Sequence, residues 1–474
     1  MTERMIRAAT GLKWSAIEKI GTQSIQLIII IILGRFLGPE AFGLIGMLSV
    51  FIAIAQTLID SGFTNAMIRK SERSEDDYST MFYINVLVSI FCYVLLYFSA
   101  PYIASFYQQH ELIDLARVIG LTFIFNSFIL VNKAKLIVLV DFKSQAKVSF
   151  LSVTLSSLVS LSMAIYGFGV WALVGQVVSF SIFNCIFMMA FFPWYPMKRF
   201  SLKSYQYLFG FGSKLLISGL IDTIYNNIYF ILIGKYFSTQ QLGYFNQAQN
   251  LTHIPSMSLA SVIQRVTYPI MSDIDDDDRL SRSFALSIKL TALVVFPILA
   301  MLAVIAKPLV SIILGDEWIS MGSLISILCV GYILYPLNAL NLNVLQIKGR
   351  SDLFLKLEII KKIIVTIIIS ITIFHGVEFV CIGIALQLYI SFIINAYFSG
   401  KLIGFGVYKQ IKILIPIWIF VLIVSLLLYF SMGYFNSDIL VLIYCLFSFL
   451  ILYFSYLWFV HRDMCSYFYL AVKS

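Results

Sequence analysis

The chain has 474 residues, of which 60% are hydrophobic and 12% charged, with a formal net charge of +9 and a mean hydropathy of +0.92. A water-soluble fold could not cover so much apolar surface with so few charges, so the composition predicts a protein embedded in a lipid bilayer. The sequence lacks the alternating strands of ~10 residues that a membrane barrel requires, which leaves an all-α integral membrane fold.

Apolar runs long enough to cross a bilayer recur along the whole chain. A spanning helix needs ~20 mostly apolar residues, and this chain has room for about fourteen with short connections. The expected spans are 14–33, 42–62, 81–100, 115–131, 148–166, 170–192, 208–233, 244–261, 284–306, 321–340, 357–374, 379–398, 413–430 and 439–460. We expect three domains: an N-terminal six-helix bundle at 1–204, a second six-helix bundle at 205–402, and two additional transmembrane helices at 403–474.

The break after the first span recurs two hundred positions later, as residues 34–43 (GRFLGPEAFG) and 234–243 (GKYFSTQQLG). Each copy has a cation after its first Gly, then an aromatic residue, and a second Gly before the next apolar run, which predicts a tight hairpin between two membrane helices. With an offset of 209, further positions match, among them Asn132 with Asn341 and Gly167 with Gly376. Six helices per copy return the chain to the same side, so the repeats are expected to be parallel and to enclose a cleft at their interface.

The distribution of Lys and Arg predicts the orientation in the membrane. With the N-terminus inside, 27 of the 33 cations fall in inner segments and 4 in outer hairpins. The positive-inside rule then places both termini in the cytoplasm. Cations that face anionic inner-leaflet headgroups account for the net charge, so no nucleic-acid partner is expected.

Two symmetry-related helices carry polar side chains at i, i+4 spacing, which gives each one polar face. On the first helix these are Glu18, Thr22 and Gln26, with Lys19 and Gln23 beside them, and on the seventh Lys214, Ser218, Asp222 and Asn226, with Asn227 adjacent. Polar groups inside a membrane are costly unless they face a cavity or one another. The pattern predicts a water-filled central cavity, with a polar seam that only holds the bundles together as the alternative.

Three further polar residues are candidate site residues, and two of them, Asp60 and His253, have an alternative interpretation. Asp60 near the end of the second span is either an ion site or a solvated helix terminus. Asn250 and His253 lie on the eighth span, where His253 is either a proton relay or a structural residue. The acidic run 275–278 lacks the alternating ligands and Gly of a calcium loop, so no metal site is expected. No nucleophile–base motif or phosphate loop is present, and we predict neither an enzyme nor a cofactor.

Four loose motifs, read together in this order, carry a family resemblance. They are residues 37–43 (LGPEAFG), 60–63 (DSGF) with 66–69 (AMIR), 166–173 (YGFGVWAL) and 348–352 (KGRSD). The chain resembles the polysaccharide flippases, the O-antigen and exopolysaccharide exporters within the multidrug/oligosaccharidyl-lipid/polysaccharide exporter superfamily, and most closely their colanic-acid exporter branch.

This resemblance implies a bacterial inner-membrane protein with two six-helix bundles in a V around a central cavity, which works by alternating access. The implied cargo is an undecaprenyl-diphosphate-linked oligosaccharide, moved from the inner to the outer leaflet. In related flippases a cationic cavity receives the diphosphate, and here Lys19 and Lys214 form a thinner cationic set than in lipid II flippases. Gln23, Gln26, Asn226, Asn227 and Asn250 would bind sugar hydroxyls. Glu18, Asp60, Asp222 and His253 would be candidates to bind a coupling H⁺ or Na⁺.

Membrane lipids are expected partners, together with a polysaccharide polymerase and chain-length machinery. Two other functions stay open from the sequence. A multidrug or organic-cation exporter of the same superfamily would have a net acidic, aromatic cavity, whereas the charges here are mixed. A membrane glycan polymerase or ligase would need a sizeable outer loop, and the longest outer segments, at about 101–114 and 307–320, are short.

Overall fold

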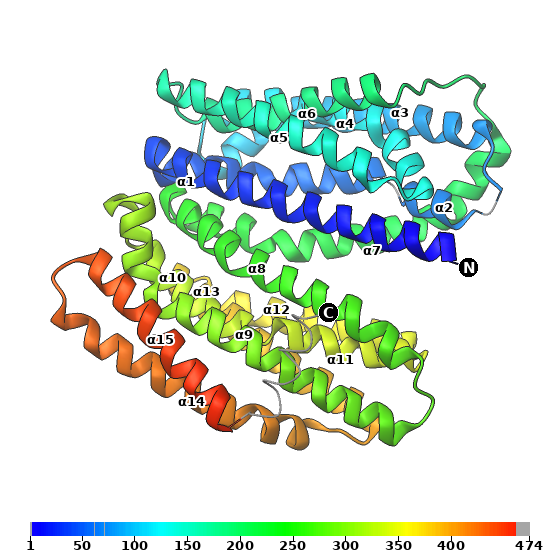
Figure 1. Cartoon of the computed structure of the whole chain (residues 1–474). Coiled ribbons are helices and arrows are strands. Elements are labelled where there is room, and N and C mark those ends of the chain that lie inside the picture. Colours follow the sequence, from blue (N-terminus) through cyan, green and yellow to red (C-terminus); the bar gives the residue numbers. More distant parts are fainter. Residues whose placement is uncertain (1, 61, 71, 461–474) are drawn as a thin grey trace. The chain divides into compact units, whose positions relative to one another are not determined.

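The computed structural model describes residues 2–60, 62–70 and 72–460, and within these ranges every regular element is a helix (Figure 1). The α-helices are α1 (Thr2–Asp60), α2 (Phe63–Arg69), α3 (Glu75–Tyr107), α4 (Leu112–Leu139), α5 (Phe142–Ile165), α6 (Trp171–Phe191), α7 (Leu202–Tyr236), α8 (Thr239–Ser272), α9 (Asp277–Leu314), α10 (Met321–Tyr332), α11 (Tyr335–Ile347), α12 (Ser351–Thr372), α13 (Val377–Ile403), α14 (Val407–Ser431) and α15 (Asp438–Val460). The all-α prediction is confirmed.

The helices are long and apolar enough for a multi-pass membrane protein. In the described part of the chain, 11 helical segments meet the length and hydropathy of a membrane span. One of them, Lys13–Arg69, contains both of the first two predicted spans. The predicted spans 244–261 and 357–374 lie in α8 and α12, which are long enough to cross but richer in polar and charged residues, and neither is among the 11.

Helix α1 folds back on itself at the first copy of the repeated motif. Its 59 residues would reach about 90 Å if straight, far more than the ~30 Å hydrocarbon core. Gly38 leaves the helical conformation with φ 66° and ψ 176°, a region that favours glycine. The N-terminus and α2 therefore both lie on the right of Figure 1. In the second copy, Phe237 and Ser238 separate α7 from α8.

The chain divides into two compact units, Met1–Gly243 (unit 1) and Tyr244–Ser474 (unit 2). Helix α7 belongs to unit 1, where it contacts α1, α2 and α3. This division differs from the predicted bundle border at 204, because the first helix of the second predicted bundle packs with the first. The three predicted domains, 1–204, 205–402 and 403–474, stay a prediction.

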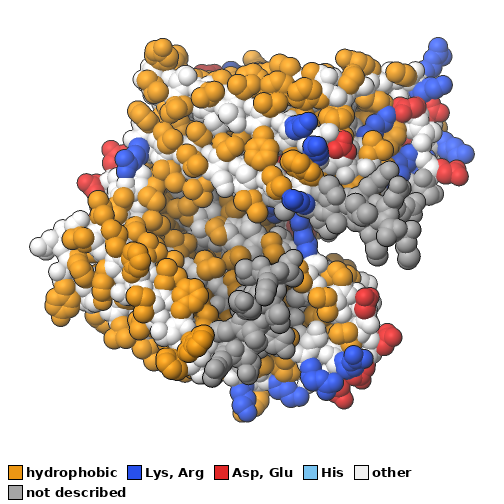
Figure 2. All heavy atoms as spheres, viewed as in Figure 1, with side chains coloured by type: hydrophobic (Ala, Val, Ile, Leu, Met, Phe, Trp, Pro, Cys, Tyr) orange, Lys and Arg blue, Asp and Glu red, His pale blue; other side chains and the backbone are white. Residues whose placement is uncertain are grey.

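The core of unit 1 next to α7 brings four helices together. Its buried side chains are Phe63, Ala66 and Met67 from α2, Tyr78 and Met81 from α3, Val131 and Ala134 from α4, and Leu208 from α7. Outside such cores the surface stays apolar, and Figure 2 shows hydrophobic side chains over most of the drawn face, with charged ones mainly towards its edges. A surface of this kind suits a lipid environment.

In unit 2, a buried amide pair ties α14 to the rest of the unit. Asn341 on α11 and Gln410 on α14 exchange two hydrogen bonds, with N–O distances of 3.1 and 2.9 Å, and both side chains are fully buried. Ser399 on α13 donates its hydroxyl to the same Asn341 oxygen at 2.5 Å. The predicted repeat partner of Asn341 is Asn132, which is also buried and donates to the carbonyl of Phe192 at 2.7 Å. Both asparagines therefore join helices within their own unit.

Candidate functional site

The two copies of the repeated motif meet in unit 1 through a reciprocal glycine contact. A Cβ atom added at Gly43 would lie 1.9 Å from the carbonyl oxygen of Thr239, and one added at Gly243 would lie 1.9 Å from the carbonyl oxygen of Pro39. The same offset of 200 relates Pro39 to Thr239 and Gly43 to Gly243, so each copy touches the other with its equivalent residues. Only glycine lets the two backbones approach this closely.

Helices α1 and α7, which carry the predicted polar faces, lie side by side in unit 1 (Figure 1). The hydroxyl groups of Thr57 on α1 and Thr223 on α7 are 2.9 Å apart and share a hydrogen bond. Gly219 packs against the methyl group of the same Thr57. The contact joins the second half of α1 to the middle of α7, so the residues predicted on these helices belong to one unit.

The polar face predicted on α7 is on one side of that helix and exposed. Lys214, Ser218, Asp222 and Asn226 all have exposed side chains at i, i+4 spacing. Asn227, one position on, is half-buried and donates its amide to the carbonyl of Thr223 at 2.8 Å. An exposed row of this kind must meet water or polar ligands, because acyl chains cannot solvate it.

On α1, Glu18 makes contacts with neighbouring helices of unit 1. Ser149 on α5 donates its hydroxyl to Glu18 at 2.6 Å, and Lys133 on α4 lies within electrostatic reach of the same carboxylate. Glu18 and Lys133 are both half-buried. A carboxylate at membrane depth is tolerated when a cation and a hydroxyl group compensate it, so this cluster keeps a charge inside unit 1.

The remaining candidates of unit 1 differ in their surroundings. Lys19 and Gln23 are half-buried, and Gln26 is exposed. Asp60 accepts a hydrogen bond from the hydroxyl of Thr64 at 2.7 Å, which places its carboxylate where α1 passes into α2. This position agrees with the helix-terminus alternative for Asp60.

In unit 2, His253 on α8 lies against two tyrosines. Its ring centroid is 5.0 Å from that of Tyr332 and 5.3 Å from that of Tyr335, which approaches edge-on. Ser256 donates to the backbone carbonyl of Tyr332 at 2.8 Å and fixes α8 against α10. Asn250, one turn before His253, donates to Asn246 on its own helix at 3.4 Å. These aromatic neighbours were not predicted from the sequence.

A polar pocket of about 390 Å³ lies between α8 and α11 of unit 2. Its polar lining includes Arg265, Gln264 and Asn343, and Gln264 donates its amide to Asn343 at 3.2 Å. Arg265 is exposed, so the pocket offers a cation with amide groups around it. Such a combination can bind an anionic or hydroxyl-rich group.

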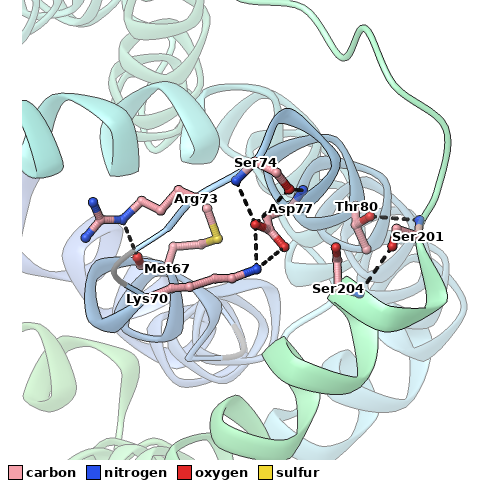
Figure 3. Close-up of polar contacts among 8 residues, drawn as sticks. All are labelled: Met67, Lys70, Arg73, Ser74, Asp77, Thr80, Ser201 and Ser204. Carbon is pink, nitrogen blue, oxygen red and sulfur yellow. Dashed lines mark hydrogen bonds and ion pairs between the residues drawn. The ribbon is translucent and has the colours of Figure 1, made fainter.

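The start of α3 carries a buried carboxylate that fixes the adjoining segments (Figure 3). Asp77 is fully buried and accepts two hydrogen bonds from Lys70, at 2.7 and 2.6 Å, and a backbone bond from Ser74 at 2.8 Å. Ser74 and Asp77 form a capping box at the N-terminus of α3. Nearby, the backbone N–H of Ser201 donates to Thr80 at 3.0 Å, which holds the start of α7 against α3.

A comparison with protein families shows which family this chain belongs to. The family described as "Polysaccharide biosynthesis protein" matches residues 32–323, more than half of the chain. The chain belongs to this polysaccharide biosynthesis protein family.

Relatives of known name agree with the family. The chain is 28% identical over 350 residues to the teichuronic acid biosynthesis protein TuaB of Bacillus subtilis (strain 168), with 73% of this chain and 72% of TuaB covered. It is 24% identical over 398 residues to the lipopolysaccharide biosynthesis protein WzxC of Escherichia coli (strain K12), with 83% and 80% covered. Both matches extend over most of the partner's length.

Solved structures with the same fold are transporters. The lipid II flippase MurJ in its inward closed conformation matches with a TM-score of 0.75 and 14% identity, over 96% of this chain and 100% of MurJ. An inward-facing multidrug resistance transporter of the MATE family, in the MOP superfamily, matches with a TM-score of 0.63 and 17% identity, over 81% and 94%. At these identities the likeness establishes the fold of this polysaccharide biosynthesis family member.

Three features of this family member were missing from the sequence prediction: Lys133 beside Glu18, the pocket around Arg265, and the pairing of Lys70 with Asp77. Each joins side chains that are on different helices or on both sides of a loop. The polar C-terminal end of α8 was a signal for Arg265, and the spacing of Ser74 and Asp77 was a signal for the helix cap. Nothing in the local sequence indicated the Lys133 contact.

Proposed function

We propose that this protein is a flippase for a lipid-linked oligosaccharide, which moves undecaprenyl-diphosphate-linked repeat units from the inner to the outer leaflet of a bacterial inner membrane. Membership of the polysaccharide biosynthesis family carries this proposal. The names of TuaB and WzxC, and the fold shared with a lipid II flippase, support it. The multi-pass helical fold offers a route across the membrane and the exposed polar row of α7 offers a surface for a hydrophilic headgroup.

The proposed roles follow from side-chain chemistry. Lys19 and Lys214 would hold the diphosphate as point charges. Amide side chains would bind the sugar hydroxyls, namely Gln23, Gln26, Asn226, Asn227 and Asn250. In unit 2, the pocket around Arg265 combines a guanidinium group with amides and would bind an anionic or hydroxyl-rich group by itself. Transport would proceed by alternating access, in which the protein opens first to one side of the membrane and then to the other.

A coupling ion, H⁺ or Na⁺, would drive the return to the inward-facing state. Glu18 is the strongest candidate to bind it, because its carboxylate is half-buried and has the hydroxyl group of Ser149 beside it. Asp222 and His253 are further candidates, and Asp60 is the weakest because it lies at a helix terminus. We place both termini in the cytoplasm, in line with the bias of Lys and Arg. A polymerase and chain-length machinery would act on the exported units.

The relatives favour a glycan over a drug as the cargo. The likeness to multidrug resistance transporters is one of fold, whereas the sequence relatives named above serve the biosynthesis of surface polysaccharides. Direct transport assays separate the two cargoes. Uptake of organic cations by vesicles that fail to translocate a polyprenyl-diphosphate oligosaccharide would contradict the proposal.

The double variant Lys19→Gln/Lys214→Gln tests the proposed diphosphate site. In a strain that depends on this protein for surface glycan, we expect the variant to reach the membrane at the normal level and to lose the glycan. The matched control is Lys409→Gln/Lys412→Gln, which removes two exposed cations from the start of α14 and should leave the glycan unchanged. Normal surface glycan in the Lys19→Gln/Lys214→Gln strain would refute the assigned roles.

A further inference from the structure

An apolar cavity of unit 1 lies between α3 and α7. It has a volume of about 520 Å³, and Leu58 and Ser213 are among its lining residues. Six aromatic rings contribute to the wall: Phe63, Tyr83, Phe91, Phe200, Tyr205 and Phe209. Along α3 the lining extends from Tyr83 to Cys92, which corresponds to about 14 Å of helix axis. The cavity is therefore narrow, apolar and parallel to the helices.

The cavity opens sideways, towards the face that the bilayer would cover. Leu87 and Phe91, both on α3 and in the lining, are 69% and 62% exposed. Across from them, Phe209 on α7 is also exposed and stacks on Tyr205 at a centroid distance of 5.4 Å. An apolar cavity open to acyl chains does not hold water, because its lining offers water few hydrogen-bond partners. A hydrocarbon chain would restore the van der Waals contacts that an empty space forfeits.

Three cations stand at one end of this cavity. Lys198 and Arg199 lie on the segment that leads into α7, next to the lining residue Phe200, and Lys203 lies in the first turn of α7. All three side chains are exposed. Tyr83, also in the lining, donates its hydroxyl to the backbone carbonyl of Lys198 at 3.3 Å. The cations therefore lie close to the end of the cavity where α3 and α7 begin.

Unlike Lys70 and Lys135, these three cations have no acidic partner among the described residues. Lys70 is paired with Asp77, and Lys135 with Glu75, at N–O distances of 2.6 and 2.8 Å. Within the described ranges, Lys198, Arg199 and Lys203 form no ion pair. Their positive charge is thus uncompensated by the protein, directly beside an apolar cavity.

We propose that this cavity is a binding site for an anionic phospholipid of the cytoplasmic leaflet, such as phosphatidylglycerol. One acyl chain would fill the groove between α3 and α7, and the phosphate would lie among Lys198, Arg199 and Lys203. Juxtamembrane cations attract anionic headgroups, and the aromatic rings Tyr83 and Tyr205 suit the membrane interface.

The occupant is a resident lipid rather than the transported cargo, because the wall of the site is fixed. The backbone N–H groups of Lys198 and Ser201 donate to Ser79 and Thr80 at 3.3 and 3.0 Å. These bonds hold the cationic segment against the start of α3, and Figure 3 shows the bond between Ser201 and Thr80. A cargo that leaves once per cycle needs a site that changes between two states. This segment is instead held in place on α3, as expected for a lipid that stabilises unit 1.

Native mass spectrometry of the purified full-length protein, titrated with phosphatidylglycerol or phosphatidylcholine, tests the site. The variant Lys198→Gln/Arg199→Gln/Lys203→Gln should bind phosphatidylglycerol roughly 100-fold more weakly, as expected for three juxtamembrane cations, with phosphatidylcholine binding unchanged. Val88→Phe, which fills the cavity from α3, should weaken both lipids. The matched control Arg279→Gln/Arg282→Gln/Lys412→Gln removes three exposed cations from unit 2 and should change neither.

Labelling with a phosphatidylglycerol that carries a diazirine in its acyl chain locates the bound lipid. We expect adducts between residues 83 and 92 of α3 and between 205 and 216 of α7, which Val88→Phe removes. Adducts spread evenly over all exposed helices, or equal binding of both lipids to the unaltered protein, would overturn the proposal. Displacement of phosphatidylglycerol from this site by undecaprenyl phosphate would also overturn it and assign the cavity to the cargo.

Discussion

The reciprocal contact between Gly43 and Gly243 makes a sharp prediction about the repeated motif. In Gly43→Ala, the new methyl group would lie 1.9 Å from the carbonyl oxygen of Thr239 and 2.8 Å from its carbonyl carbon. Real Cβ atoms do not approach other atoms this closely, and both obstacles belong to the backbone, so the helices must separate. Overpacking of this kind typically costs about 1–3 kcal/mol, and we expect the upper part of that range here.

Symmetry extends the prediction to the other copy of the motif. Gly243→Ala meets the carbonyl oxygen of Pro39 at the same 1.9 Å and should destabilise the protein by a similar amount. The double variant Gly43→Ala/Gly243→Ala should lose less than the sum of the two, because the separation forced by one methyl group also makes room for the other.

Thermal unfolding of the detergent-solubilised protein measures the effect, and Gly210→Ala provides the control. Gly210 lies within α7, and a Cβ atom there would meet no atom within 4 Å. Replacement of a helical glycine by alanine without a clash gains up to ~1 kcal/mol of helix propensity, so Gly210→Ala should be neutral or stabilising. If Gly43→Ala unfolds at the same temperature as Gly210→Ala, the close approach of the two motifs is wrong.

The remaining predictions concern buried polar groups. Asp77→Ala should lower the free energy of unfolding by about 2 kcal/mol, because it removes a helix cap and leaves the partly exposed Lys70 unpaired, and an unchanged unfolding temperature would contradict this. Asn341→Leu should cost about 1–2 kcal/mol by leaving the buried side-chain oxygen of Gln410 without its donor. Adding Gln410→Leu to Asn341→Leu should lower the free energy of unfolding by less than Gln410→Leu does alone. Strictly additive effects of the two substitutions in unfolding measurements would contradict the pairing of Asn341 with Gln410. His253→Phe should keep the aromatic packing and the unfolding temperature but flatten the dependence of glycan export between about pH 5 and 8, and an unaltered pH profile would assign His253 a structural role.

The class of fold and the approximate positions of the membrane helices could be predicted from the sequence alone. Most predicted spans lie in one observed helix apart from one or two end residues, because a run of ~20 apolar residues is a local property that needs no partner to be recognised. The span predicted at 321–340 instead crosses the break between α10 and α11. The duplicated motif was equally visible, and its first copy indeed breaks the helical conformation, at Gly38. The polar face of α7 followed from the i, i+4 spacing of its residues, which sets their side of the helix.

Which residues those faces meet depends on how the helices pack. The periodicity of α1 places Glu18 on a polar face, but the approach of Ser149 and Lys133 depends on how α4 and α5 pack against it. The sequence indicates that Asp77 caps a helix, but its ion pair with Lys70 forms only because the loop between α2 and α3 brings the two side chains together. Helix α7 was expected in the second bundle, and its packing with α1 in unit 1 creates both the glycine contact and the aromatic cavity. Side-chain spacing fixes directions around one helix axis, whereas distances between helices arise from packing many side chains at once.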